Sequence, residues 1–259
     1  MATPRALVLR TAGTNCDRET LYALDRAGFQ AERVHVLRAI DSPATLDEGQ
    51  LLVIPGGFSY GDDVSAGKIL ANQMLHHLGE VLRRFVAADK LMLGICNGFQ
   101  VLIKAGLLPE PSVDAATAGH AVTLAWNDNG QFVDRWVHLR ADSDVCLFVR
   151  KGDVITLPVA HGEGKVVCRD DDVLGRLRGG DQVALRYCDA DGATGTPGAN
   201  PNGSVDAIAG LCDPTGRILG LMPHPERFVD VVQHPTWTRG GVTAADGLGM
   251  FERARKALA

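Results

Sequence analysis

The sequence lacks long apolar runs and clustered positive charge. No stretch approaches 18 consecutive apolar residues, so we expect no membrane-spanning helix. Residues 1–5 do not lead into the apolar segment of an export signal. No run of lysines and arginines marks a nucleic-acid-binding surface, and the formal net charge is −5. These absences argue against both nucleic acid and membrane as partners.

Metal-binding and disulfide patterns are missing as well. The six cysteines are scattered and include no Cys-x-x-Cys pair, which argues against a zinc site or a disulfide framework. Nothing resembles a P-loop, so no ATP site is expected on this chain. Scattered cysteines without an export signal are typical of the reducing cytoplasm, which is the location we expect. We therefore expect neither a metal nor a cofactor on this chain.

The first 110 residues have the pattern of an α/β protein. Four apolar runs of strand length alternate with segments of helical periodicity, and these runs lie at 6–9, 31–37, 51–54 and 91–95. The helical segments between them include 17–27 and 67–88. This alternation predicts a doubly wound, mostly parallel sheet flanked by helices. No linker or repeat divides the 259 residues, so we expect a single domain over 1–259.

After about residue 110 the pattern changes to short strand-like runs separated by Gly, Asp and Asn turns. The runs lie near 120–126, 132–139, 145–149, 154–160, 164–168, 183–187, 205–212 and 217–221. Because they have little helical periodicity, they predict antiparallel strands added to the α/β body. A last helix is expected at about 246–258.

The strongest functional signal is Cys96, which has glycines two places before and two places after it. An apolar strand run leads into Cys96, and a helix-compatible segment follows at 99–105. The glycines permit the tight turn of a nucleophile elbow, at which a helix N-terminus favours the thiolate. The N–H of Asn97 is then placed to donate to an oxyanion. The alternative is a buried cysteine at the end of a core strand, and the glycine spacing favours the elbow.

A cysteine nucleophile needs a base, and eight histidines compete for that role. His224 follows a strand-like run and stands between two prolines that restrict its backbone. Glu226, two residues on, points to the same side of an extended chain and can set the tautomer of His224. The pattern predicts a Cys96–His224–Glu226 triad. His161 has the same His-x-Glu spacing, but its flanking glycines favour a supporting or subunit-contact loop.

The third apolar run, 51–54, stops at a Pro-Gly-Gly turn. A backbone N–H approaches a developing negative charge only where side chains are missing. Gly57 is therefore the predicted second oxyanion donor, with Gly56 beside it at the substrate. The alternative is a simple strand-to-loop turn. The Pro-Gly-Gly turn is expected beside the elbow, because the carboxyl ends of parallel strands share one edge of the sheet, and this position favours a functional role.

Together these segments resemble the class I, or triad, glutamine amidotransferases. Further motifs occur in order and narrow the resemblance; all of the matching segments lie at 13–17, 55–62, 96–100, 161–164, 200–204 and 222–227. This set is similar to the family of glutaminase subunits of phosphoribosylformylglycinamidine synthase, over nearly the whole chain. The sequence departs from the usual pattern of this family at 11–12, 63–67 and 229–245, and these segments lie outside the predicted triad.

The resemblance implies a reaction. Cys96 attacks the side-chain amide of L-glutamine, and His224 protonates the leaving ammonia and then activates water to hydrolyse the thioester. It also implies that Gln100, Asn202 and Gly203 help to bind glutamine. The ammonia passes to a synthetase subunit, which uses ATP and Mg²⁺, and a small third subunit often bridges the two.

Two other functions remain open at this point. One is a standalone γ-glutamyl hydrolase or peptidase of the same architecture, which would turn over glutamine without responding to a partner. The other is a non-catalytic protein with a cysteine elbow that acts as a redox sensor or interaction module. The His224/Glu226 pair argues against the second, because a sensor does not need it.

Overall fold

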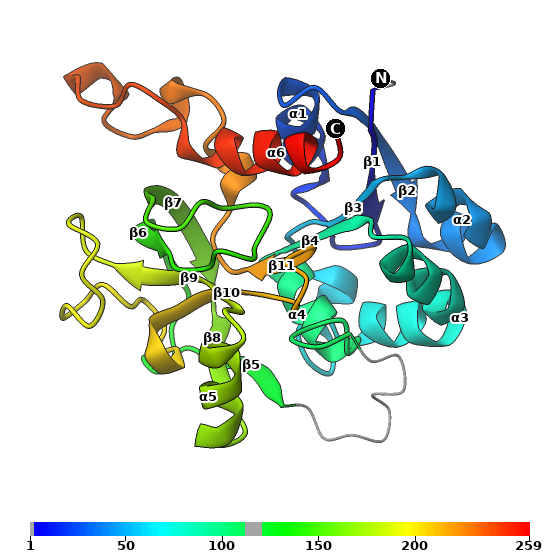
Figure 1. Cartoon of the computed structure of the whole chain (residues 1–259), viewed down its shortest axis with the longest axis horizontal. Coiled ribbons are helices and arrows are strands. Elements are labelled where there is room, and N and C mark those ends of the chain that lie inside the picture. The colour runs from blue at the N-terminus through cyan, green and yellow to red at the C-terminus, as the bar shows by residue number, and fades with distance from the viewer. Residues whose placement is uncertain (1–2, 112–120) are drawn as a thin grey trace.

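The computed structural model describes residues 3–111 and 121–259, and its centre is a nine-stranded sheet (Figure 1). The strand order is β2-β1-β3-β4-β11-β10-β9-β6-β7. The strands are β1 Arg5–Arg10, β2 Gln30–His35, β3 Leu51–Ile54, β4 Leu91–Ile95, β6 Val133–Ala141, β7 Val154–His161, β9 Val183–Cys188, β10 Ile208–Cys212 and β11 Ile218–Leu221. A separate two-stranded sheet pairs β5, Val122–Trp126, with β8, Glu163–Cys168.

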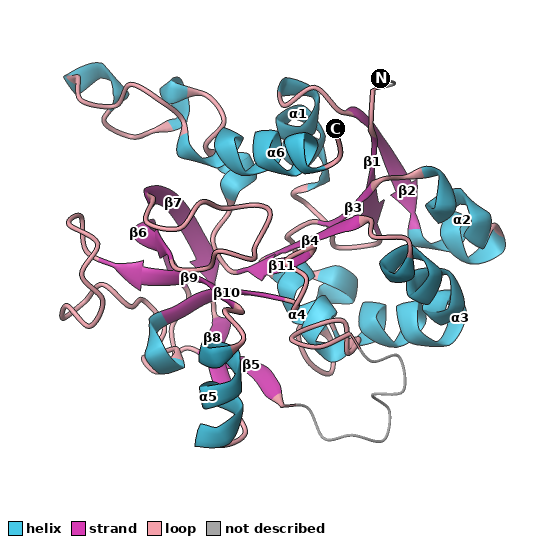
Figure 2. Ribbon diagram, viewed as in Figure 1, coloured by secondary structure: helices cyan, strands magenta, loops and turns pink. Residues whose placement is uncertain are grey.

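Helices cover the parallel part of the sheet on both sides. Helices α1 and α6 lie on one side and α3 and α4 on the other (Figures 1 and 2). The helices are α1 Asp17–Arg26, α2 Val36–Asp41, α3 Lys68–Ala87, α4 Asn97–Lys104, α5 Asp171–Gly179 and α6 Asp246–Ala257. Short 3₁₀ segments lie at Pro43–Glu48, Ser59–Asp62, Val205–Ala207, Pro225–Arg227, Val231–Gln233 and Trp237–Arg239. The predicted α/β architecture is thereby confirmed.

The sheet changes from parallel to antiparallel at β11. Strands β2, β1, β3 and β4 pair in parallel, and β11 also pairs in parallel with β4. Beyond it, β10, β9, β6 and β7 are antiparallel. The prediction of added antiparallel strands is correct for these four. It is wrong for the run at 217–221, because β11 continues the parallel body.

Two other predictions in the second half need correction. The run at 145–149 is a loop, in which the Val145 N–H donates to the Asp181 carboxylate and the Leu147 N–H to the Gly216 carbonyl in place of a neighbouring strand. The run at 205–212 begins as a 3₁₀ turn and becomes a strand only at Ile208. The run at 120–126 is present as β5, and residue 120 lies outside the described residues.

Because β3, β4 and β11 pair in parallel, their carboxyl ends lie at the same edge of the sheet. These strands are buried along their whole length, which explains their continuous apolar sequences. Helix α4 packs directly onto them through glycines. A Cβ on Gly98 would lie 1.8 Å from the Ile54 carbonyl oxygen, and one on Gly220 would lie 2.1 Å from the Phe99 ring. The close packing fixes the start of α4 above the sheet edge.

Within the described ranges, none of the helices combines the length and the apolar character that a membrane crossing requires.

Candidate active site

Cys96 occupies a strained turn between β4 and α4. Its φ of 51° lies in the left-handed region that a side chain rarely adopts. Neighbouring backbone groups hold this conformation. The Cys96 N–H donates to the Leu221 carbonyl at 2.7 Å, and the Cys96 carbonyl accepts from the N–H groups of Phe99 and Gln100. The strand, sharp turn and helix of the predicted elbow are therefore present.

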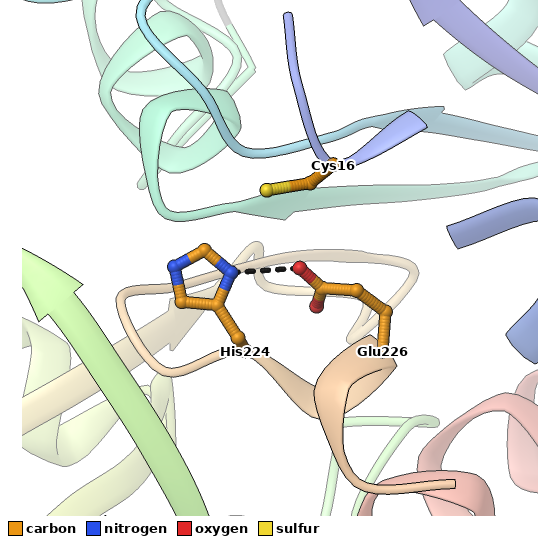
Figure 3. Close-up of side chains that lie close together, drawn as sticks. All are labelled: Cys16, His224 and Glu226. Carbon is orange, nitrogen blue, oxygen red and sulfur yellow. Dashed lines mark hydrogen bonds and ion pairs between the residues drawn. The ribbon is translucent and has the colours of Figure 1, made fainter. Parts of the chain in front are cut away.

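His224 and Glu226 form a buried pair just beyond β11 (Figure 3). The Nδ1–H of His224 donates to Glu226 Oε1 at 2.7 Å, and both side chains are at least 98% buried. Burial alone would lower the pKa of His224. The charge of Glu226 and the nearby thiols of Cys96 and Cys16 outweigh it and raise this pKa well above its usual value. Nε2 has no hydrogen-bond partner among the described residues, so it is available to a ligand.

Two backbone N–H groups beside Cys96 are also available. Neither the N–H of Gly57 nor that of Asn97 has a backbone or side-chain acceptor within the described part of the chain. Gly57 has a φ of 140°, and a Cβ there would lie 2.7 Å from the Gly13 carbonyl oxygen. The Asn97 side chain accepts from the Ser59 N–H at 3.1 Å and donates to Asp62 at 3.0 Å, which ties the segment after Gly57 to the elbow. This arrangement suits an oxyanion site.

Gly57, Cys96 and His224 line one pocket of about 230 Å³. The remaining walls come from Asn15, Cys16, Phe58, Phe132, Asp134, Ala160 and Arg227. Pockets for drug-sized ligands measure roughly 300–1,000 Å³, so this one fits a smaller molecule such as a single amino acid.

The residues predicted to bind substrate lie elsewhere. Gly56 packs against His224, where an added Cβ would lie 2.8 Å from the ring. The amide of Gln100 donates to the Glu163 carbonyl at 2.5 Å and accepts from Asn97 at 2.9 Å. Neither Gly56 nor Gln100 lines the pocket around Cys96. Their predicted contact with glutamine therefore has no support from the pocket geometry.

The same holds for Asn202 and Gly203. Asn202 donates to the Gly164 carbonyl at 2.8 Å. A Cβ on Gly203 would lie 1.9 Å from the carboxylate of Asp128, and Gly203 borders a different surface pocket. Gln100 and Asn202 thus hold the turn at 161–164 from two sides, and this is the role that the geometry gives them.

His161 does not form a second His–Glu pair. It is 97% buried, and its Nδ1 lies 3.1 Å from Asn127 Oδ1, while Glu163 pairs with Lys104 at 3.2 Å. Burial, together with the charge of His224, lowers the pKa of His161 to about 4, so its ring is neutral at physiological pH. This placement fits the predicted supporting loop. No local sequence pattern indicates Asn127 as the partner of His161.

Cys16 also lines the pocket, although no pattern around it in the sequence predicts a role there. Its thiol faces the His224 ring, and Figure 3 shows it beside the His224–Glu226 pair. Donor atoms of these three residues lie within 4.8 Å of one another, close enough to consider a metal site. The His224–Glu226 hydrogen bond already uses two of the donors. Burial raises the pKa of Cys16 to about 11, which disfavours the thiolate that metals bind. The cluster is therefore better explained as part of the catalytic pocket.

The two pocket thiols are expected to differ in reactivity. Iodoacetamide at neutral pH should alkylate Cys96 well before Cys16, because the raised pKa of Cys16 keeps it as the unreactive thiol. Mass spectrometry of peptides after partial labelling measures both rates. In the Cys96→Ala variant, Cys16 should still label slowly. Equal labelling of the two cysteines, or faster labelling of Cys16, would contradict this assignment.

A strained cysteine and a histidine line one pocket together, the histidine pairs with a buried glutamate, and two backbone N–H groups, of Gly57 and Asn97, have no acceptor among the described residues. This arrangement defines the site of a triad hydrolase of amides or esters. Comparison with known proteins narrows this class. Residues 3–257 match the family of CobB/CobQ-like glutamine amidotransferase domains. The chain belongs to this glutamine amidotransferase family.

The chain is also similar over 90% or more of its length to individual proteins. The phosphoribosylformylglycinamidine synthase subunit PurQ of Dehalococcoides mccartyi is 44% identical over 99% of this chain and 98% of that protein. The subunit of the same name from Methanococcus maripaludis is 40% identical over 90% of this chain and 86% of its own. A chain in the structure of PurLQS from Thermotoga maritima is 32% identical, with a TM-score of 0.75 and complete coverage of both chains.

Proposed function

We propose that this chain, as a single domain, is the glutaminase subunit of a phosphoribosylformylglycinamidine synthase. It hydrolyses L-glutamine to glutamate and ammonia and delivers the ammonia to an ATP-dependent synthetase subunit in purine biosynthesis. The observation that carries the proposal is the 44% identity over 99% of the chain to a subunit of that name. The pocket supports it, because the predicted nucleophile and base lie in it together.

The first half of the reaction forms a thioester. The Cys96 thiolate attacks the amide carbon of glutamine, and the N–H groups of Gly57 and Asn97 donate hydrogen bonds to the developing oxyanion. The C–N bond then breaks as His224 gives a proton to the departing nitrogen. The raised pKa of His224 favours the imidazolium that supplies this proton, and Glu226 fixes the ring that carries it.

The second half releases glutamate. His224, now neutral, takes a proton from water as the water attacks the thioester carbon. The same two N–H groups stabilise the second oxyanion. The C–S bond breaks, glutamate leaves, and Cys96 and His224 return to their starting state. Every step uses groups of this chain, so ATP and Mg²⁺ belong to the synthetase subunit in this proposal.

One feature of the structure supports a partner subunit, and another supports a cytoplasmic location. Phe58 and Phe132 on the pocket wall are 48% and 55% exposed, which provides apolar surface for the synthetase subunit or a small bridging subunit to cover. The six cysteines are free in the described part of the chain, as a reducing compartment requires.

The test is glutamate release from glutamine, measured with and without the synthetase subunit, its ATP and its substrate. We expect low activity alone and a large increase with the complete partner system. Brisk turnover that does not change with the partner would instead indicate a standalone γ-glutamyl hydrolase. If glutamine is not turned over in either case while Cys96 is reduced, the chain is a binding or sensor protein.

A further inference from the structure

Asp134 lines the same pocket as the nucleophile. It is on β6 directly opposite Ala160 of β7, and both residues line the pocket of Cys96. The Ala160 carbonyl accepts from the Cys96 thiol at 3.8 Å. Opposed residues in an antiparallel pair have Cα atoms about 4.5–5.5 Å apart, so Asp134 is the cross-strand neighbour of the residue that contacts the Cys96 thiol.

The carboxylate of Asp134 is not used by the fold. It has no hydrogen-bond or ion-pair partner among residues 3–111 and 121–259, although the next residue, Arg135, donates to the Gly198 carbonyl at 2.6 Å. A cationic group that arrives with a substrate can therefore pair with this free carboxylate.

Arg227 brings the opposite charge to the same pocket. Its Nε donates to Glu19 at 2.9 Å and its Nη2 contacts the Cys16 sulfur at 3.2 Å. These contacts fix the plane of the guanidinium. They leave Nη1 without a partner within the described residues and available to an anion.

The charges of the pocket therefore match those of a free amino acid. We propose that Asp134 binds the α-ammonium group of glutamine and that Arg227 binds its α-carboxylate. Four covalent bonds separate the α-nitrogen from the amide carbon that Cys96 attacks, so both ends fit one small pocket. The two residues thus select free glutamine over simple amides. This inference rests on the proposed glutaminase function.

The test compares two substrates in the complex with the synthetase subunit. One is glutamine, and the other is glutaramate, which has the same amide and carboxylate but no α-ammonium group. In the Asp134→Asn variant, KM for glutamine should rise by about 10- to 100-fold, as expected for a lost hydrogen bond between charged groups, with kcat changed little. The kcat/KM for glutaramate should stay at the wild-type value, so the preference for glutamine shrinks.

The matched control is Asp191→Asn, which makes the same charge change at an exposed residue outside the pocket. It should leave both substrates unaffected, and both variants should keep synthesis from free ammonia. An unchanged KM in Asp134→Asn, or an equal loss for glutamine and glutaramate, would overturn the assignment of Asp134. If the wild-type complex does not use glutamine at all, the proposed function itself fails.

Arg227 is tested with γ-aminobutyramide, which lacks the α-carboxylate. Arg227→Gln should lose most of the wild-type preference for glutamine over this analogue. An undiminished preference would contradict its role as the carboxylate partner.

Discussion

Cys96→Ala is expected to lower glutamate release from glutamine by at least about 10⁴-fold, because no other group can form the thioester. Cys16 is in the same pocket but cannot substitute, since burial raises its pKa to about 11 and keeps it protonated. The measurement is glutamate release by the complex with the synthetase subunit at saturating glutamine. Residual activity near the wild-type level would remove Cys96 from the mechanism.

The same variant separates catalysis from folding. Synthesis from free ammonia does not need the glutaminase site, so the Cys96→Ala complex should retain it. Loss of both activities would indicate a misfolded or unassembled subunit. Cys168→Ala serves as the control, because Cys168 lies on β8 and does not line the pocket. It should keep both activities.

The catalytic elements were predictable because their signals are local. Glycines around Cys96, the Pro-Gly-Gly turn ending at Gly57 and the prolines around His224 each determine the backbone within a few residues. The strands that carry them are fully buried and read as continuous apolar runs. Once the sheet is parallel, the shared edge of its carboxyl ends brings these segments together.

Elements that depend on distant partners were not predictable. The direction of β11 is set by its pairing with β4, and no local pattern encodes a parallel or antiparallel partner. The segment at 145–149 has a strand-like sequence, but its Val145 N–H donates to the Asp181 carboxylate. In both cases a tertiary contact overrides the local signal. Helix α5 differs, because its cap is local: the Asp170 side chain accepts from the Val173 N–H, and the short, polar segment has little helical periodicity.

The substrate contacts show the same limit. Gln100 and Asn202 were assigned by resemblance, yet their amides are held by the carbonyls of Glu163 and Gly164. Asp134 and Arg227 carry no motif of their own for substrate binding. Asp134 reaches the pocket through the pairing of β6 with β7, and Arg227 through the turn after His224. Local sequence patterns do not show that these two segments meet at the pocket.

Glu226→Gln is expected to lower kcat for glutamine hydrolysis by about 10³- to 10⁴-fold. Glu226 accepts from Nδ1–H of His224 and so leaves Nε2 for proton transfer with Cys96. In the variant, the side-chain amide introduced at position 226 can donate to Nδ1 of His224 instead. It would then favour the other His224 tautomer, in which the proton is on Nε2. The measurement is glutamate release by the assembled complex at saturating glutamine. Glu252→Gln, at an exposed position on α6, is the matched control and should leave kcat unchanged.

The pH dependence tests the same assignment independently of the rate. Burial lowers the pKa of His224, and the Glu226 charge is the largest contribution that raises it. Glu226→Gln should therefore move the alkaline limb of kcat/KM to lower pH. A histidine whose pKa is raised on folding adds stability below its unfolded value of about 6.5, and this is lost as pH rises through the folded value. The difference in unfolding free energy between wild type and Glu226→Gln should thus be largest at acidic pH, below about 6.5, and should shrink as the pH rises. An unshifted limb together with a rate near wild type would show that Glu226 does not act on His224.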